Sequence, residues 1–185
     1  MAWHGSAVRV VAGELGGRRI AAPRGPGRPT SELVRAAVFN SLDARGVVLG
    51  AFVADLFAGS GALGIEALSR GAARAVFVEE DPTAVAAIRG NVTALALTDR
   101  AVIRPVSVER WAAAREDHVD LVLADPPYGW AGWEGLFSAL ASRPTPLVVA
   151  ESDRMVSASG WEVVASKRHG GTVVTQLRHE ESHAP

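Results

Sequence analysis

The sequence has no cysteine, a single lysine, and no apolar run of membrane-spanning length. Without cysteine the chain can form neither a disulfide nor a thiolate metal site. The five histidines are scattered rather than spaced as ligands, so no metal is expected. The chain also lacks a signal-peptide pattern at its start, and no membrane partner is expected. The cytoplasm is therefore the expected compartment.

The residues that are present suit one compact domain with a small appendage, since 48% of the 185 residues are apolar and 21% are charged. The formal net charge of −1 hides an uneven distribution, because residues 1–50 carry seven arginines against three acidic residues. We expect a basic extension over residues 1–29 and the main domain over residues 30–185. Such an extension indicates contact with an anion such as nucleic acid, although a solvated basic face would have the same composition.

The pattern of apolar residues predicts an α/β fold. Residues 8–20 indicate a short β-hairpin, residues 23–29 a stiff loop, and Thr30 or Ser31 the N-cap of a helix that ends near Gly46. Further strands are predicted over residues 51–57, 75–79, 101–106, 119–124, 146–151, 161–165 and 172–177, and helices over residues 62–70, 82–95, 108–115 and 132–141. This alternation implies a parallel sheet with helices on both faces, and such sheets bind ligands at the carboxyl ends of their strands.

The stretch Asp125-Pro126-Pro127-Tyr128 follows a short apolar run and ends that strand abruptly. Because proline nitrogens donate no hydrogen bond, the stretch is rich in acceptors and suits a ligand group that donates, such as an amine. The Tyr128 ring offers a flat face for stacking. A Pro-Pro turn with a solvated carboxylate is the plain structural alternative. Trp130 and Trp133 could cover a bound base, but packing of a helix face explains them more simply.

A second motif runs from Asp55 to Gly64 and contains G-x-G-x-x-G, and Glu79 follows Gly59 by twenty residues. The spacing is typical of dinucleotide sites, so a nicotinamide- or flavin-dependent oxidoreductase stays open as an alternative. A pyrophosphate at the glycine turn would, however, meet the carboxylate of Asp55. S-adenosylmethionine carries a sulfonium, an amino group and no phosphate, which removes the conflict.

In that interpretation Asp55 holds the amino-acid end of the cofactor and Glu79 its ribose hydroxyls, while the backbone of the glycine turn approaches it closely. Ser107 and Val108 would bracket the adenine, or Ser107 would only cap the next helix. The expected cofactor residues are Asp55, Phe57, Ala58, Gly59, Ser60, Gly61, Glu79, Ser107 and Val108.

The loop Asp55–Gly61 followed by Asp125–Tyr128 resembles the class I S-adenosylmethionine-dependent methyltransferases that act on exocyclic amines. More narrowly, the chain resembles the RsmD family, which methylates the N2 of a guanine in small-subunit (16S) ribosomal RNA. The resemblance extends over nearly the whole chain and rests on Arg9–Gly13, Gly17–Arg19, Arg28–Arg35, Phe39-Asn40, Asp55–Gly71, Glu79, Asp125–Tyr128 and Glu151-Ser152. The Arg28-Pro29-Thr30 helix entry is its most family-specific part.

The resemblance implies a Rossmann-like, seven-stranded mixed sheet whose last strand is antiparallel, behind an N-terminal hairpin. It implies an enzyme that uses S-adenosylmethionine on 16S ribosomal RNA, for which we expect the small subunit or an assembly intermediate as substrate, with naked RNA left open. We also expect a monomer that needs no metal. The implied catalytic residues are Asp125, Pro126, Pro127 and Tyr128, and the expected RNA-binding residues are Arg9, Arg18, Arg19, Arg28, Thr30 and Arg35.

Three positions depart from the family pattern. Ala36 stands where an acidic residue is usual, Ser107 where Asp or Asn is frequent, and Thr175 where the last strand often carries Tyr. Two further alternatives stay open beside the oxidoreductase. An adenine-N6 DNA methyltransferase would use the same acceptor geometry, and a non-catalytic RNA-binding assembly factor could share the fold.

Overall fold

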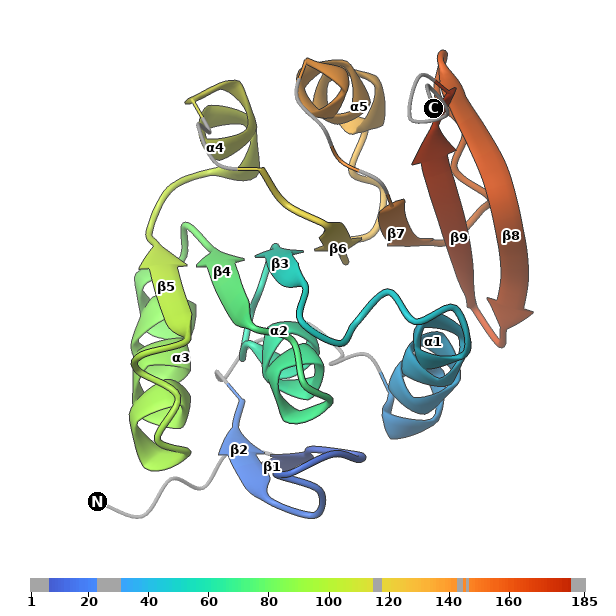
Figure 1. Cartoon of the computed structure of the whole chain (residues 1–185). Coiled ribbons are helices and arrows are strands. Elements are labelled where there is room, and N and C mark those ends of the chain that lie inside the picture. Colours follow the sequence, from blue (N-terminus) through green and yellow to red (C-terminus); the bar gives the residue numbers. More distant parts are fainter. Residues whose placement is uncertain (1–6, 23–30, 115–117, 143–144, 146, 181–185) are drawn as a thin grey trace.

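The computed structural model describes residues 7–22, 31–114, 118–142, 145 and 147–180. Its elements follow in the order β1 (Ala7–Arg9), β2 (Arg19–Ala21), α1 (Glu32–Ala44), β3 (Phe52–Leu56), α2 (Ala62–Ser69), β4 (Arg74–Val78), α3 (Pro82–Ala94), β5 (Ala101–Arg104), α4 (Val108–Ala114), β6 (Leu121–Ala124), α5 (Trp133–Ala141), β7 (Leu147–Ser152), β8 (Trp161–His169) and β9 (Thr172–His179) (Figure 1). Each helix and strand expected from the sequence is present, with ends shifted by a few residues.

Local side-chain chemistry sets several of these ends. Ser31 begins α1, because its hydroxyl accepts a hydrogen bond from the Val34 N–H at 3.2 Å. Asp81 begins α3 in the same way, accepting from the Ala84 N–H at 2.8 Å, and Pro82 occupies the first helical position. β5 ends directly before Pro105, which cannot donate to a ladder.

The seven-stranded sheet has the order β5-β4-β3-β6-β7-β9-β8. Strands β3 to β7 are parallel, whereas β9 runs antiparallel to both of its neighbours, β7 and β8. The predicted mixed sheet with an antiparallel last strand is thus confirmed. The chain leaves β3 toward β4 and β5, then returns to β6 on the other side, which makes the boundary between β3 and β6 the topological switch point.

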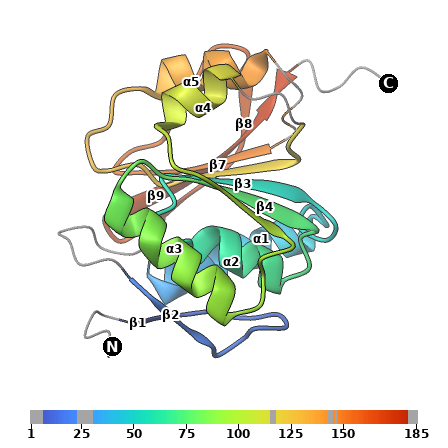
Figure 2. The same cartoon turned by 90° about the vertical axis from the view of Figure 1, so that its left-hand side faces the viewer.

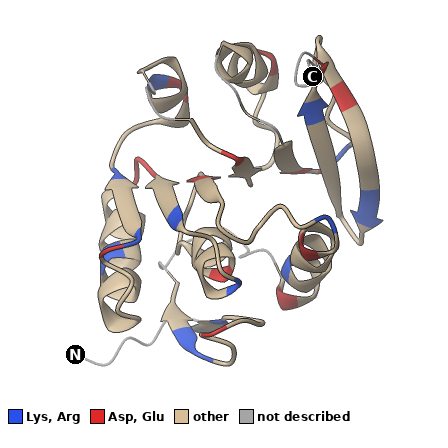
Figure 3. Ribbon diagram, viewed as in Figure 1, with Lys and Arg blue, Asp and Glu red and all other residues tan. Residues whose placement is uncertain are grey.

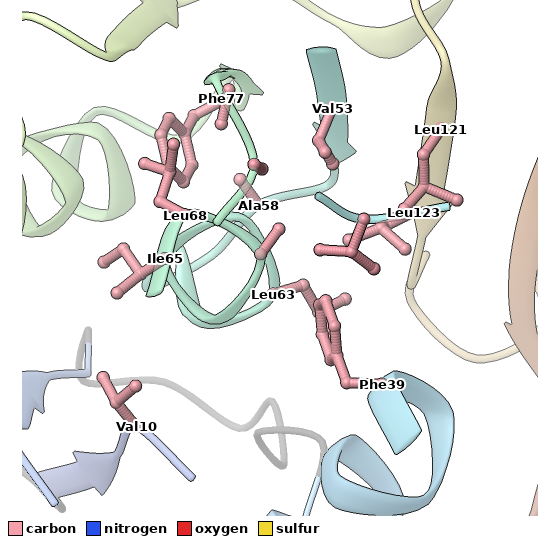
Figure 4. Close-up of a cluster of buried hydrophobic side chains, with 14 of the residues drawn as sticks. Val10, Phe39, Val53, Ala58, Leu63, Ile65, Leu68, Phe77, Leu121 and Leu123 are labelled. Carbon is pink, nitrogen blue, oxygen red and sulfur yellow. The ribbon is translucent and has the colours of Figure 1, made fainter. Parts of the chain in front are cut away.

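Helices cover both faces of the sheet. Figure 2 shows α1, α2 and α3 on one face and α4 and α5 on the other. The helices α1, α2 and α3 pack on the sheet through an apolar core. In this core Leu121 and Leu123 of β6 lie with Leu63 of α2 and Phe39 of α1 (Figure 4). The core on the other face includes Leu136 of α5. The central strands β3, β6 and β7 are therefore buried on both faces, and their functional groups reach solvent where the strands end.

The β1–β2 hairpin packs against the outside of α2, where Val10 joins the same core (Figure 4). Glu66 of α2, which is 0% exposed, accepts hydrogen bonds from the N–H groups of Val11 at 2.7 Å and Ala12 at 3.1 Å. The backbone carbonyl of Ser69, in the same helix, accepts from the Glu14 N–H at 2.8 Å. The extension is therefore docked on α2 by apolar and polar contacts together.

Arg35 belongs to this docking site, and its expected place on the RNA-binding surface is wrong. Its side chain is 1% exposed, its guanidinium donates to the Arg9 carbonyl, and its Nε lies 3.7 Å from a Glu66 carboxylate oxygen. Burial lowers the pKa of Arg35, while the charge of Glu66 acts to raise it. A guanidinium enclosed in this way stabilises the hairpin and cannot reach a phosphate.

Candidate functional site

The predicted site residues gather where β3, β4 and β6 end, at the switch point of the sheet. Leu56 pairs with Val78 of β4 and with Ala124 of β6, so the residues that follow these three are neighbours across the sheet. Those residues begin the glycine turn, the segment that contains Glu79, and the Asp125 stretch. Residues separated by as many as 68 positions in the sequence, from Phe57 to Asp125, therefore share one edge.

The glycine turn has a backbone that L-residues rarely adopt. Gly59 has φ 55° and Gly61 has φ 79°, both in the left-handed region. Gly64 is needed for a different reason, because a Cβ there would lie 2.4 Å from the Phe77 ring. Phe57 also has a positive φ, 59°, although it is not glycine. Such strain costs about 1–3 kcal/mol and is concentrated at functional sites.

Asp55 lies inside the protein, 1% exposed, where one carboxylate oxygen accepts the Gly64 N–H at 2.8 Å. It therefore fixes the first turn of α2 against the end of β3. Burial raises the pKa of Asp55 well above its usual range, against the opposing hydrogen bond from Gly64, and the charges of Asp125 and Glu79 raise it further. A cation bound between these carboxylates would relieve that repulsion.

Glu79 connects the end of β4 to the glycine turn. One carboxylate oxygen accepts the Gly59 N–H at 2.8 Å, and the other accepts the Asp81 N–H at 2.9 Å. Because a carboxylate has about four lone-pair sites, these two bonds leave acceptor capacity for a ligand hydroxyl. The predicted ribose partner therefore lies directly beside the predicted backbone cradle.

The Asp125 stretch follows β6 as expected. Asp125 and Pro126 are half-buried, whereas Pro127 and Tyr128 are exposed, Tyr128 by 73%. Trp130 is half-buried, and its ring packs edge-on against Phe57 and against Trp133, each with centroids 5.0 Å apart. Trp130 therefore packs against the strained Phe57, and Trp133 packs behind Trp130, which supports the packing interpretation of both tryptophans.

The remaining predicted contacts are less distinctive. The Ser107 hydroxyl accepts the Arg110 N–H at 3.3 Å, so it caps α4, and Val108 is buried. Arg9, Arg18 and Arg19 are exposed on the hairpin, as an RNA surface requires. Arg28 and Thr30 lie outside the described residues. No cluster of three or more acidic or histidine side chains suited to a metal was found in the part of the chain that the structure describes.

Asn91 of α3, which the sequence motifs do not identify, joins the extension to the glycine turn. Its side-chain oxygen accepts the Ala21 N–H at 2.8 Å, and its amide nitrogen lies 2.9 Å from the carbonyls of both Ala21 and Ser60. Glu66 was also missed, although a lone carboxylate within the apolar run of α2 could have been noticed. Glu66 lies within the Asp55–Gly71 stretch and Asn91 lies outside every motif, but for both residues only the fold shows the partners.

Comparison with known proteins places this geometry among methyltransferases. A sequence model of the family described as "Conserved hypothetical protein 95" matches residues 8–178. YlbH of Bacillus subtilis, assigned as an rRNA methyltransferase, is 36% identical over 162 residues, which are 80% of this chain and 84% of that protein. Ribosomal RNA small subunit methyltransferase D of Haemophilus influenzae is 30% identical over 174 residues, 88% of this chain and 89% of the other.

Solved structures share the whole architecture. YhhF of Escherichia coli, assigned as a methyltransferase, superposes with a TM-score of 0.84 at 27% identity, covering 95% of this chain and 99% of that one. An RNA methyltransferase from Salinibacter ruber in complex with S-adenosyl-L-homocysteine gives a TM-score of 0.66 at 22% identity, covering 85% and 97%. The second likeness concerns the fold alone. Among the described residues, no helix is both long and apolar enough to cross a membrane.

Proposed function

The chain belongs to the RsmD family, and from this we propose that it transfers a methyl group from S-adenosylmethionine to the N2 of a guanine in 16S ribosomal RNA. The observation that carries the proposal is the meeting of the Asp55 glycine turn with the Asp125 stretch at one sheet edge. The first suits a cationic donor and the second suits an amine acceptor. Methyl transfer between them needs no metal and no covalent enzyme intermediate.

The charges at the edge favour S-adenosylmethionine over a dinucleotide. Glu79 and Asp125 lie close enough to Asp55 for their charges to raise its pKa. A pyrophosphate would therefore add a further anion to a site that already holds carboxylates. Asp55 would hold the amino group, Glu79 the ribose hydroxyls, and Ala58–Gly61 the cofactor by their backbone, with Ser107 and Val108 toward the adenine. When bound, the cofactor supplies a methyl on a sulfonium, whose C–S electron pair leaves with sulfur.

The acceptor stretch prepares the guanine for attack. The N2 lone pair is conjugated with the ring and is a poor nucleophile. Hydrogen bonds from the two amine hydrogens to the Asp125 carboxylate and the Pro126 carbonyl would hold that lone pair toward the methyl group. Asp125 also offsets the positive charge that develops on nitrogen as the N–C bond forms, and Asp125 or water then takes one proton. The exposed Tyr128 ring is open to stack on a base turned out of its helix or loop.

An adenine-N6 methyltransferase acting on DNA is the second candidate, because an adenine amine would fit the same acceptors. Incubating the enzyme with labelled cofactor and either ribosomal RNA or DNA, followed by mass spectrometry of the nucleosides, separates the two. An assembly factor without catalysis would bind the cofactor and release no methylated nucleoside. An oxidoreductase would bind NAD rather than S-adenosylhomocysteine in calorimetry.

Replacing Asp125 tests the catalytic role directly. We expect Asp125→Ala to keep its affinity for S-adenosylhomocysteine and to lose roughly 10²–10³-fold in methyl transfer, as removal of one group that stabilises transition-state charge does elsewhere. The matched control is Asp99→Ala, an exposed carboxylate outside the site. A fully active Asp125→Ala enzyme would refute the mechanism. Sequencing of methylated guanines in ribosomal RNA from a strain lacking the gene identifies the target nucleotide.

A further inference from the structure

The tip of the β8–β9 hairpin carries an exposed basic pair that no motif singled out. Lys167, the only lysine of the chain, and Arg168 close β8 just before the Gly170-Gly171 turn, and both are exposed. Figure 3 shows basic residues at the arrowhead of β8 and an acidic residue near its start. The positive charge of this strand is therefore concentrated at one of its ends.

The register of the sheet aligns that end with the acceptor stretch. Lys167 pairs with Val174, which pairs with Glu151 of β7, and Arg168 pairs with Val173, which pairs with Ser152. Ala150, just before Glu151, pairs with Ala124, just before Asp125. The basic pair and Asp125 therefore share the carboxyl edge of the sheet. Three strand spacings separate them, a span of roughly 14 Å at about 4.8 Å each.

Over the described ranges of the chain, Lys167 and Arg168 lack the ion pairs that charged residues elsewhere on the hairpin and in the segment after β7 form. Arg178 lies 2.8 Å from Glu162, and Arg154 lies 3.4 Å from Asp153. Within the described residues, no carboxylate is found within ion-pair distance of Lys167 or Arg168. Because successive strand residues point to opposite faces, the two cations extend to both sides of the hairpin edge.

Exposed charges also keep edge strands from pairing with other chains. That role would be served by charges anywhere along β8, and it does not require cations at the end that shares the carboxyl edge of the sheet with the acceptor site. The Gly170-Gly171 turn that joins β8 to β9, where Gly170 has φ 61°, carries no side chains that would hinder the approach of another backbone. These features together suit the phosphate backbone of a nucleic acid.

We propose that Lys167 and Arg168 form a second RNA-contacting surface. This surface binds phosphates of the RNA on the side of the acceptor stretch that faces away from the Asp55–Gly64 turn. The inference rests on the proposed function. Lysine contributes a flexible point charge and arginine a planar fork that binds a phosphate through two donors. Such contacts add affinity and fix the position of the RNA without reading its sequence.

The test measures how the affinity for 16S ribosomal RNA made by transcription, which carries no methyl groups, depends on salt concentration. The protein without substitutions is compared with the double variant Lys167→Gln/Arg168→Gln. Each phosphate contact contributes about 0.7 to the slope of log affinity against log salt for single strands and about 0.9 for duplexes. We expect the double variant to lower the slope by roughly 1.4–1.8. The control, Arg45→Gln/Arg89→Gln, removes two exposed charges, one at the C-cap of α1 and one on α3, and should leave the slope unchanged.

The outcomes separate this inference from the function it rests on. Lys167→Arg/Arg168→Lys should retain the slope of the unmodified protein, and all variants should retain their affinity for S-adenosylhomocysteine. A Gln/Gln variant that methylates the RNA with an unaltered slope overturns the second surface and leaves the enzyme assignment standing. An equal fall of the slope in the Arg45/Arg89 control would show that only the total charge of the protein matters, and it would also overturn the second surface. An unmodified protein that binds the cofactor but neither binds nor methylates the RNA overturns both.

Discussion

Replacing Glu66 should release the N-terminal extension and lower the stability of the whole domain. Its carboxylate is fully buried, accepts two backbone N–H groups of the hairpin, and lies 2.7 Å from the Nε of Arg70 and 3.7 Å from that of Arg35. Glu66→Ala would leave the buried Arg35 without its nearest opposite charge and the two N–H groups without their acceptor. Both losses act on the folded state alone.

The expected magnitude follows from the burial of the pair. Removing one partner of a buried ion pair costs about 3–5 kcal/mol, whereas an exposed pair contributes about 0–1 kcal/mol. For a chain of this size that loss lowers the melting temperature by roughly 6–20 °C. Glu66→Gln should lie between Glu66→Ala and the unmodified protein, because it keeps one acceptor oxygen but presents an amide donor to groups that already donate.

The chain offers a matched control in Glu14, which also joins the hairpin to the body but through a solvent-exposed pair with Arg100. Glu14→Ala should change the free energy of unfolding by less than about 1 kcal/mol. Urea denaturation gives the global loss, and trypsin cleavage after Arg18 and Arg19, followed by mass spectrometry, reports opening of the hairpin. If Glu66→Ala matched Glu14→Ala in both assays, Glu66 would not be the anchor of the extension.

Two further predictions concern the cofactor edge and the hairpin turn. The pKa of Asp55 is raised, chiefly by burial, so its contribution to stability is present below about pH 4 and is lost as pH rises through its folded pKa. Asp55→Asn should therefore become more stable relative to the protein without the substitution as pH is raised above about 4. A difference in melting temperature between the two proteins that stays constant from pH 4 to 8 would contradict this. Gly13 and Gly17 both have φ 82°, but a Cβ on Gly13 would lie 1.9 Å from the Ser69 carbonyl oxygen, whereas nothing lies within 4 Å of one on Gly17. Gly13→Ala should thus lower the melting temperature more than Gly17→Ala, and equal losses would show that backbone strain alone matters.

The sequence predicted the elements and the edge where the motifs meet, because both depend on local signals. Apolar runs, glycines and capping residues identify strands and helices, and alternating strands and helices imply parallel pairing. Once the sheet is parallel, Asp55, Glu79 and Asp125 must come to the same edge. The fold class follows from these signals and the family from the resemblance of the motifs, and the comparisons confirm both.

Arg35 shows where local signals end. The sequence analysis expects Arg35 to bind RNA, which requires its side chain to be exposed. In the folded chain the hairpin and Glu66 of α2 enclose that side of the helix. Periodicity identifies the face of a helix that packs on the sheet, but it carries no information about a second layer that arrives from another part of the chain. The basic pair at Lys167 was missed for a related reason, since only the register brings it to the acceptor edge.

The shared support of the extension and the glycine turn determines which substitutions can test RNA binding. Asn91 connects Ala21 of the hairpin to the carbonyl of Ser60, so a change that shifts the hairpin backbone also disturbs the predicted cofactor turn. Loss of methylation in such a variant would not distinguish RNA binding from cofactor binding. Substituting the exposed Arg18 and Arg19 avoids this, because neither side chain takes part in those contacts. A lower salt slope with unchanged affinity for S-adenosylhomocysteine would then assign the hairpin to the RNA, and an unchanged slope would place the RNA elsewhere on the enzyme.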